Sequence, residues 1–482
     1  MLAAEHDLDA LLPLILVEAA LTVEAERCTL FIIDRETDEL VSKVAQGAEQ
    51  EIRISRDEGI AGTVSRTGVP LNIPDAYSDP RFSALTDQQL GFRTRQLLCV
   101  PMRDRRGGMV GVIQALNRRT DTPFTEEDEE LLLALGSQAA GAIENAFLHE
   151  DINNLFEGFV SASVVAIESR DPSTAGHSGR VADLSVNLAE AVARGGSGVF
   201  RDIRFSRAEL RELRYAALLH DFGKVGVREP VLVKAEKLYP EELEVLKARF
   251  ELARMDAQLQ SYRRRMARVR AGEHARLDTL EAEEEHRLAQ ELQHLDEMLG
   301  FVLKCNRPTI LEEGGFERLT ELAHRTYCDS RGHSHPLLNE RDVALLSIPK
   351  GTLSVEERRE IESHVTHTYR FLEQIPWTKD LRSVPEIAYA HHEKLDGSGY
   401  PRALSAAAIP VQSKIMAISD IYDALTAADR PYKKAVPHER ALDILGQEAK
   451  RHAIDGELLR IFIEAEVPRR ALNSRSGGGA GS

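Results

Sequence analysis

The sequence of 482 residues contains only four cysteines, and no two of them form a CxxC pair. Disulfide frameworks and cysteine-rich zinc sites need clustered thiols, so this spacing argues against both. No apolar run approaches the roughly 20 residues that cross a bilayer. The N-terminus carries acidic residues where a signal peptide would have a basic segment. We therefore expect a cytoplasmic protein that neither enters a membrane nor is secreted.

Positive charge is also in short supply, because 61 Lys and Arg residues stand against 78 Asp and Glu residues, for a net charge of -17. An excess of negative charge repels phosphate backbones and anionic membranes, so we expect no nucleic-acid polymer and no membrane as partner. A small phosphorylated ligand would need a basic pocket of its own. The length and the 43% hydrophobic content allow two or three domains with separate cores.

Short β-rich runs and amphipathic helical patterns alternate in the first part of the chain. The runs at 28–33, 96–100 and 109–113 predict strands, and the turn residues at 104–108 predict a hairpin between the last two. Apolar residues recur every three or four positions before these runs, from Leu8 to Ile15, and after them, from Leu132 to Ala146. This order indicates an α+β domain.

Several short motifs accompany these elements: Gly59-Ile-Ala-Gly62, Asn72-Ile-Pro-Asp75, Asp79-Pro-Arg-Phe82, and the closing set Asn117-Arg118, Phe124, Asp128 and Glu129. Together they make residues 1–148 resemble a GAF domain, with Arg118 where the family's closing signature usually has lysine. The resemblance implies a small-molecule sensor or a dimerisation module. An Arg118–Asp128 ion pair of purely structural role, beside a pocket without a regulator, is the alternative interpretation.

A helical pattern follows the GAF-like region and begins at Thr125 and Asp128, which are spaced as a capping box. It continues through residues 149–170 without proline and predicts one connecting helix, although two short packed helices would show the same pattern. Such helices commonly pair along an apolar seam, so we expect a homodimer. At the other end of the chain, residues 469–482 form a low-complexity tail that should be disordered.

Residues 234–338 form another unusual region, rich in Glu, Arg, Leu and Ala and broken near Gly272. The periodicity predicts an inserted hairpin of two antiparallel helices followed by a loop. The outer charges favour a solvated surface over a partner-binding surface. The loop contains four residues that could suggest zinc, but their irregular spacing favours a solvated loop. These four are His324, Cys328, His333 and His335.

A His-Asp dipeptide follows a helix that Ser206 and Glu209 open with a capping box. The helix should stop at Gly223, which would place His220 and Asp221 in its last turn. An imidazole and a carboxylate so placed can share one divalent cation or bridge two. A single such pair arises readily by chance, so the assignment depends on further residues of the same kind.

Further candidate ligands recur downstream and upstream on other predicted helices. His177 begins a helical pattern, and His364 lies on a helix that Ser354 and Glu357 cap and that ends before Pro376. Two adjacent histidines close a helix begun near residue 385, and their side chains diverge by about 100°, so they can serve different metals. Two aspartates lie one turn apart on a helix over 413–428. These two pairs are His391 with His392 and Asp420 with Asp423.

Three strings stand in order along this half of the chain: His220-Asp221 with Gly223-Lys224, the run His391-His392-Glu393-Lys394-Leu395-Asp396-Gly397-Ser398-Gly399-Tyr400-Pro401, and Asp420-Ile-Tyr-Asp423 followed by Arg430-Pro-Tyr-Lys433. Together they resemble the HD-GYP family of HD-domain phosphohydrolases, over 171–233 and 339–468. The resemblance implies an all-α HD-type helical bundle, here with the inserted hairpin, and seven metal ligands. The seven are His177, His220, Asp221, His364, His391, His392 and Asp420.

The resemblance further implies hydrolysis of cyclic di-GMP to pGpG or GMP, with two divalent ions, iron or manganese by preference and zinc as a compatible third. Ser173 stands where some members carry an acidic ligand for a third metal, which favours two. Asp221 and Lys224 would be catalytic, with Lys224 placed to hold phosphoryl charge and protonate the leaving oxygen. Substrate contacts would come from Lys224, Asp396, Gly397, Gly399, Tyr400, Asp423, Arg430 and Lys433.

Two other functions remain open at this stage. The chain could be a non-enzymatic receptor for a cyclic dinucleotide that signals through the inserted hairpin, although a receptor has no need of ligands that activate water. It could also be an HD hydrolase that acts on another cyclic dinucleotide or phosphoester. Product formation would separate the first alternative from the enzyme, and a panel of substrates would separate the second.

Overall fold

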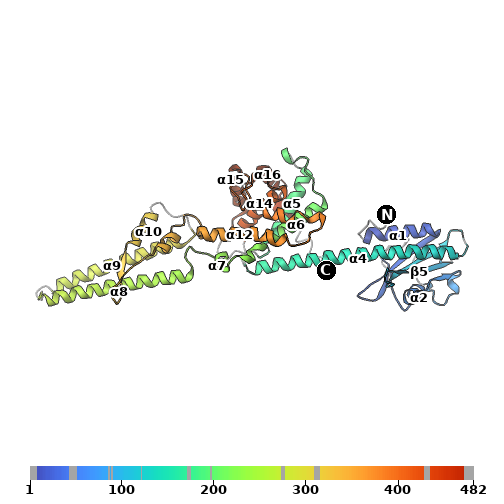
Figure 1. The fold of residues 1–482 in the computed structure, drawn as a ribbon, viewed down its shortest axis with the longest axis horizontal. Coiled ribbons are helices and arrows are strands. Elements are labelled where there is room, and N and C mark those ends of the chain that lie inside the picture. Colours follow the sequence, from blue (N-terminus) through green and yellow to red (C-terminus); the bar gives the residue numbers. More distant parts are fainter. Residues whose placement is uncertain are drawn as a thin grey trace. The chain divides into compact units, whose positions relative to one another are not determined.

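The computed structural model describes residues 8–42, 52–84, 87, 91–120, 122–170, 175–195, 198–272, 277–308, 315–427 and 435–471 (Figure 1). The chain divides into two compact units, Met1–Phe159 and Val160–Ser482. The finer domain limits at 148, 170, 233, 338 and 468 stay predictions. Residues 469–471, the first of the tail expected to be disordered, are helical, so that expectation is wrong for them, and the tail lies outside the described residues from position 472 onward.

The first unit is built around one antiparallel sheet with the strand order β3-β2-β1-β6-β5-β4. The three predicted strands are present and longer than expected. β2, β3 and β4 were not predicted, because runs of three or four residues give too little alternation to recognise. The strands are β1 Ala25–Ile33, β2 Glu39–Ser42, β3 Ile52–Ser55, β4 Leu71–Ile73, β5 Leu97–Arg103 and β6 Met109–Arg118.

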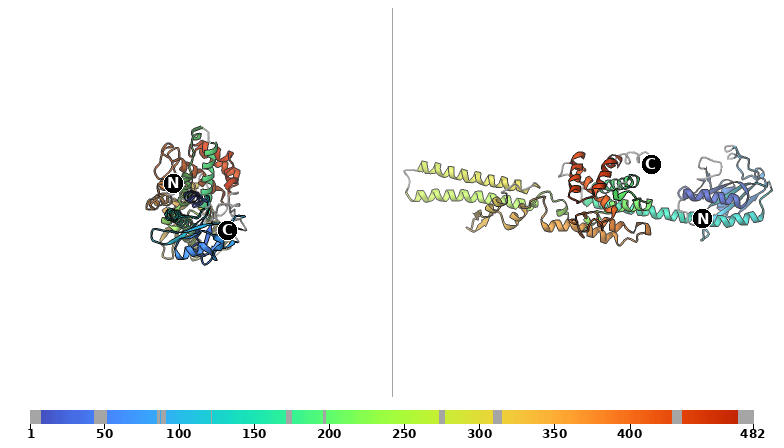
Figure 2. Two further views of the ribbon diagram at one scale, coloured as in Figure 1. Left: turned by 90° about the vertical axis from the view of Figure 1, so that its right-hand side faces the viewer. Right: turned by 90° about the horizontal axis from the view of Figure 1, so that it is seen from above.

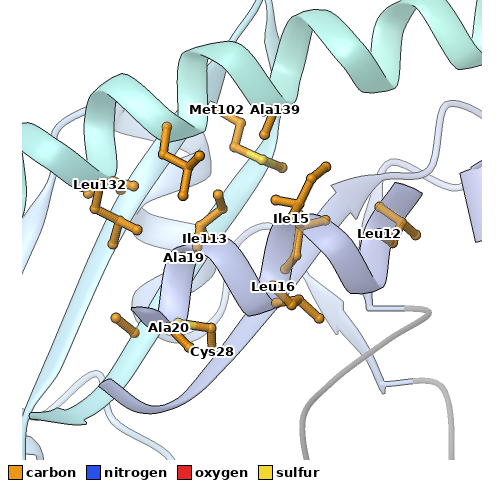
Figure 3. Close-up of a cluster of buried hydrophobic side chains, with 14 of the residues drawn as sticks. Leu12, Ile15, Leu16, Ala19, Ala20, Cys28, Met102, Ile113, Leu132 and Ala139 are labelled. Atoms are coloured by element: carbon orange, nitrogen blue, oxygen red, sulfur yellow. The ribbon is translucent and has the colours of Figure 1, made fainter. Parts of the chain in front are cut away.

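Helices cover both faces of this sheet, which confirms the α+β domain. α1 (Leu8–Thr22) and the first part of α4 (Glu126–Arg170) pack on one face, and α2 (Gly59–Thr67) packs on the other. Figure 3 shows the first core, in which Ile15 of α1, Ile113 of β6 and Leu132 of α4 meet. A short 3-10 helix, Ala76–Ser78, follows β4.

α4 is a single helix of 45 residues, so the prediction of one connecting helix is confirmed over the alternative of two. Its start is capped as expected, since the Asp128 carboxylate accepts the Thr125 backbone N–H at 2.7 Å and the Thr125 hydroxyl accepts the Asp128 N–H at 3.2 Å. By length and composition alone, this helix would be long and apolar enough to cross a membrane. The partly buried core helix of a soluble protein passes the same test, so membrane insertion does not follow from it.

The second unit is largely helical. Its helices outside the insertion are α5 His177–Gly195, α6 Arg207–Leu219, α7 Glu229–Leu232, α11 Glu340–Leu346, α12 Val355–Leu372, α13 Val384–Tyr389, α14 Val411–Thr426, α15 His438–Lys450 and α16 Gly456–Glu464. Short 3-10 helices occur at Gly198–Phe200, Phe222–Gly226 and Lys379–Leu381. The capping boxes predicted at Ser206 and Ser354 are both formed.

The predicted inserted hairpin is also present. α8 (Pro240–Arg270) and α9 (Leu277–Asn306) lie side by side in Figures 1 and 2 and share an apolar core. The segment expected to be a solvated loop instead contains α10 (Gly315–Ala323) and a two-stranded hairpin of β7 (Thr326–Cys328) and β8 (Ser334–Pro336). Alternation over three residues is too short to signal these strands. No described residue of this segment belongs to a cluster able to hold a metal ion.

A buried ion pair ties the start of α12 to the segment that precedes α8. Lys234 Nζ lies 2.7 and 2.8 Å from the two Glu357 carboxylate oxygens, and the Tyr239 hydroxyl donates to the same carboxylate at 2.7 Å. The Lys234 and Glu357 side chains are only 2% and 10% exposed. Burial opposes ionisation of Glu357, but the hydrogen bonds outweigh it and hold its pKa below the usual 4.5.

Glu357→Gln should therefore destabilise the second unit by about 3 kcal/mol at pH 7, since it leaves the Lys234 ammonium buried without a countercharge. A carboxyl with a lowered pKa stabilises the fold above its unfolded pKa, and this stabilisation is lost as the pH falls through the folded pKa. Urea unfolding at pH 7 and below pH 4 should show the gap between variant and wild type narrowing in acid. An equal gap at both pH values would contradict this account.

Candidate metal centre

All seven predicted ligands converge in the second unit. Three overlapping groups of side chains have ligand atoms within 4.8 Å of one another, and together the groups contain every predicted ligand. The side chains come from the start of α5, the segment after α6, the middle of α12, the turn after α13 and the middle of α14. The three groups are His364, His391 and His392; His177, His220 and Asp221; and His220, His391 and Asp420.

Two carboxylates lie at the middle of this cluster. One Asp221 oxygen is 3.5 Å from His220 Nε2 and the other is 3.3 Å from His364 Nε2. Asp420 lies 3.2 Å from His177 Nε2, and its second oxygen is 4.0 Å from His392 Nδ1. Each carboxylate thus has imidazoles on both of its oxygens, as expected of a group that bridges two cations.

The local chain geometry aims three imidazoles at the centre. His220, His364 and His391 each place Nδ1 against the backbone carbonyl three residues earlier, at 2.7, 2.5 and 2.6 Å. A ring nitrogen that donates to a carbonyl leaves Nε2 as the basic nitrogen, and such outer contacts are typical of metal-bound histidines. Sequence periodicity gives no sign of these contacts, because they depend on the rotamer.

The fourth imidazole is oriented by a carboxylate. His177 Nδ1 lies 2.7 Å from one oxygen of Asp423, and the other oxygen of Asp423 accepts a hydrogen bond from Arg180 Nε at 2.7 Å. Asp423, predicted to contact substrate, therefore lies behind His177, and its substrate role stays a prediction. Arg180 was not predicted, although it follows His177 by one turn of α5, a spacing that places both on one helix face.

Asp423→Asn should weaken metal binding by about 10- to 100-fold, because the orientation and basicity of His177 depend on this carboxylate. Metal content measured by elemental analysis after dialysis against graded Mn²⁺ would show the shift. Because this residue acts through His177, saturating metal should restore most of the turnover. Unchanged metal affinity would show that the contact is merely structural.

Burial and neighbouring charges favour the protonation states in which most of these side chains can bind a metal ion. Burial lowers the pKa of His392 to about 3, against the pull of Asp420, and lowers that of His391 well below 6.5. Burial opposes ionisation of Asp221, but the Lys224 ammonium 2.8 Å away and the imidazoles of His220 and His364 together outweigh it and hold the carboxyl pKa well below 3.8. Neutral imidazoles beside ionised carboxylates are the protonation states that divalent cations require.

His177 differs from the other imidazoles. Burial disfavours its charged form, but hydrogen bonds to Asp420 and Asp423 raise its pKa to about 9. The two carboxylates thus favour the protonated imidazole, and a cation that binds His177 must displace a proton from its ring.

An unmatched nitrogen shows that the cluster fits a cation. Within the described part of the chain, His391 Nε2 is buried and has no hydrogen-bond partner. A buried polar atom without a partner costs about 1–3 kcal/mol, which a metal at this position would relieve. Nitrogen and carboxylate donors without thiolate suit iron, manganese or zinc. The donor set therefore fits the implied pair of divalent cations.

The His-Asp dipeptide is held in place by a close approach of α12. Thr368 Oγ donates to the His220 carbonyl and accepts from the Gly223 N–H, both at 2.8 Å. A Cβ on Gly223 would lie 1.9 Å from the His364 carbonyl oxygen, so only glycine fits. Thr368 was not singled out from the sequence, although it follows His364 by four residues on the same face of α12.

The glycine-rich loop lies beside the more exposed edge of the cluster, where the Tyr400 ring centre is 4.8 Å from that of His392. Its shape depends on Glu393, which was not predicted as a site residue and whose carboxylate accepts the N–H groups of Arg402 and Leu404 at 2.7 and 2.8 Å. A Cβ on Gly399 would lie 2.3 Å from the backbone nitrogen of Lys394. The close approach of the backbone thus requires a glycine here, and the predicted contact of Gly399 with substrate stays a prediction.

Some expectations about the site need correction or remain untested. α6 ends at Leu219 and α13 at Tyr389, so the His-Asp dipeptide and the two adjacent histidines follow their helices instead of lying in the last turns. In the first case the chain tightens into the 3-10 helix Phe222–Gly226. Asp396 is exposed and its carboxylate accepts the Ser398 N–H in a turn. Ser173, Arg430 and Lys433 lie outside the described residues.

Comparison with known proteins agrees with this architecture. The GAF domain profile matches residues 7–143, and two HD domain profiles match residues 174–299 and 341–458. The chain therefore contains a GAF domain followed by an HD domain. The HD domain, together with the buried histidine and aspartate clusters, indicates a metal-dependent phosphohydrolase.

Three solved structures illustrate what this chain is similar to. The GAF domain of a phosphoenolpyruvate-protein phosphotransferase from Coxiella burnetii is 25% identical over 31% of this chain and 90% of that chain, with a TM-score of 0.29. A free methionine-R-sulfoxide reductase from Neisseria meningitidis is 22% identical over 31% and 84%, with a TM-score of 0.27. A GAF domain/HD domain protein from Geobacter sulfurreducens is 18% identical over 31% and 99%, with a TM-score of 0.26.

Proposed function

We propose that this chain is an HD-GYP-type phosphodiesterase that opens cyclic di-GMP to pGpG or GMP in the cytoplasm, under control of its GAF domain. The observation that carries the proposal is the convergence of five imidazoles and two carboxylates, with the glycine-rich loop and its Tyr400 beside them. The seven side chains would hold two divalent cations. When bound, the cations would supply Lewis acidity to the phosphoryl oxygens and lower the pKa of water toward neutrality.

The chain's own groups would position the substrate at the most exposed ligand. The His392 side chain is 27% exposed, whereas the His220 and His364 side chains are 1% and 2% exposed, so a phosphodiester would approach from the His392 side. Burial raises the pKa of Tyr400, so its hydroxyl stays protonated and can donate to a phosphate oxygen. The Lys224 ammonium adds positive charge next to Asp221.

The GAF domain offers a place for a regulator. A cavity of about 210 Å³ lies among the sheet, α2 and the segment that follows β4, and its lining includes Arg27, Thr29 and Gln114. The Arg27 guanidinium lies 4.2 Å from the centre of the Phe92 ring. A small polar molecule is the ligand that such a lining supports.

Turnover assays on the purified full-length chain test the proposal. Anaerobically loaded protein with Fe²⁺ or Mn²⁺ should convert cyclic di-GMP to a linear product faster than it converts other cyclic dinucleotides or simple phosphodiesters. Tight nucleotide binding without product would favour a non-enzymatic receptor. Preferential turnover of another nucleotide would mean that cyclic di-GMP is not the main substrate. No turnover with any divalent metal would refute the proposal that this chain is an enzyme.

A further inference from the structure

α8 of the insertion carries two apolar stripes, and only one of them is used within the chain. The first is buried in the hairpin core, where α8 and α9 lie side by side (Figure 2). It consists of Leu246, Phe250, Ala253, Ala257 and, at its polar end, Ser261.

The second stripe repeats every seven residues over four heptads, with its a positions at Val245, Leu252, Leu259 and Met266 and its d positions at Ala248, Met255, Tyr262 and Val269. All eight side chains are exposed, Met255 by 64% and Tyr262 by 62%. At about 3.6 residues per turn, this stripe lies on nearly the opposite side of α8 from the buried one. A sustained a/d repeat is the pattern of a coiled-coil seam, and a continuous exposed apolar stripe marks an interaction surface.

We propose that the a/d stripe of α8 pairs antiparallel with the same stripe of a second copy of this chain. The charge along the helix identifies a second copy as the occupant. The exposed acidic residues lie in its first half, at Glu241, Glu244 and Glu251, whereas the exposed Arg263 and Arg270 lie in its second half. A helix with an acidic start and a basic end is complementary to itself when the two copies run in opposite directions.

The flanking residues agree with this direction. Antiparallel pairing about a two-fold axis near Ala257 brings Glu244 and Glu251 of one copy level with Arg270 and Arg263 of the second copy, each twice. Arg249 and Arg265 of the two copies also come level, but their repulsion is moderated because each already forms an ion pair within its own copy, with Asp342 and Glu281 respectively.

A parallel pair would be worse in charge and in packing. In register, it would set Glu251 against Asp256 and Arg265 against Arg270, and it would place Tyr262 against itself. Antiparallel pairing instead sets Ala248 opposite Met266 and Leu252 opposite Tyr262, so small side chains face large ones. From Val245 to Val269 the stripe is about 36 Å long. Eight apolar side chains from each copy over this length suit the roughly 1,200 Å² that a stable interface buries.

Cysteine cross-linking tests the pairing and its direction in the full-length protein. Val245→Cys and Val269→Cys are made separately, with Cys328→Ser in both because Cys328 is the one native cysteine that is not buried. An equal mixture of the two should form a disulfide-linked dimer on mild oxidation, whereas neither variant alone should. Cross-linking of each variant to itself would mean a parallel pair, and no cross-link in any sample would mean no pairing; either result overturns the proposal.

Introducing charged residues into the a/d stripe gives an independent test of the pairing. Met255→Glu with Leu259→Glu should halve the mass of the particle in analytical ultracentrifugation, whether wild type is a dimer or a tetramer that also associates through α4. The matched control is Ala289→Glu with Gln293→Glu, which places two exposed charges four residues apart on α9 and should leave the mass unchanged. A circular dichroism spectrum like that of wild type would show that the hairpin still folds. A wild-type mass retained by the stripe variant would overturn the proposal.

Discussion

Asp221→Ala should abolish the proposed phosphodiesterase activity, with a loss of at least about 1,000-fold, and should lower the metal content of the protein. The Asp221 carboxylate lies within 4 Å of the three imidazoles of His177, His220 and His364, and one of its oxygens is 2.8 Å from Lys224 Nζ. Removing it takes away a shared ligand and the negative charge that keeps divalent cations among neutral imidazoles. Lewis-acid stabilisation of several kcal/mol corresponds to that loss, at about 1.4 kcal/mol per tenfold in rate.

The measurement combines turnover with elemental analysis of anaerobically purified protein. Asp443→Ala is the matched control, because Asp443 is exposed on α15 and forms only a surface ion pair with Arg440 at 3.7 Å. The control should keep wild-type metal content and rate. Wild-type turnover by Asp221→Ala would refute the assigned centre.

Gly223→Ala should damage the fold and the centre together. The added Cβ would lie 1.9 Å from the His364 carbonyl oxygen and 2.5 Å from the Thr368 nitrogen, both backbone atoms of α12 that cannot turn away. α12 must then shift and carry His364 with it. Overpacking of this kind costs about 1–3 kcal/mol or more, so the second unit should melt several degrees lower, and metal binding should weaken.

Gly446→Ala supplies the control for this second prediction. Gly446 lies within α15, and a Cβ there would meet nothing within 4 Å, so alanine should leave the melting temperature unchanged or raise it. Scanning calorimetry and metal analysis on both variants would separate a local clash from a general effect of alanine. Equal melting temperatures for Gly223→Ala and wild type would mean that α12 can shift to accommodate the added Cβ without loss of stability.

The sequence predicted the ligands better than it predicted the chain around them. His220 and Asp221 were recognised by type and order, but the helix before them ends earlier than the pattern suggested. Apolar periodicity does not register where an α-helix tightens into a 3-10 turn, because both place apolar residues three or four apart. The short strands β2, β3, β4, β7 and β8 were missed for a related reason, since three or four residues carry too little pattern.

The sequence also did not predict the residues that hold the candidate ligands and the glycine-rich loop in place. The family resemblance suggested Asp423 as a substrate contact, a role that stays a prediction, but nothing in the sequence indicated that its carboxylate contacts His177, which lies 246 positions earlier in the chain. Thr368 and Glu393 looked like ordinary polar residues. Their partners are backbone groups of other segments, and a linear pattern cannot show which segment approaches.

The sequence by itself determined the order of domains, the long helix, the inserted hairpin and the chemical identity of the candidate ligands, because periodicity, capping boxes and residue types are local properties. Only the tertiary structure decided that the seven ligands meet, which nitrogen each of four imidazoles presents, and that α8 leaves a second apolar stripe exposed. Those features depend on distances between segments far apart in the chain, and such distances are set by packing.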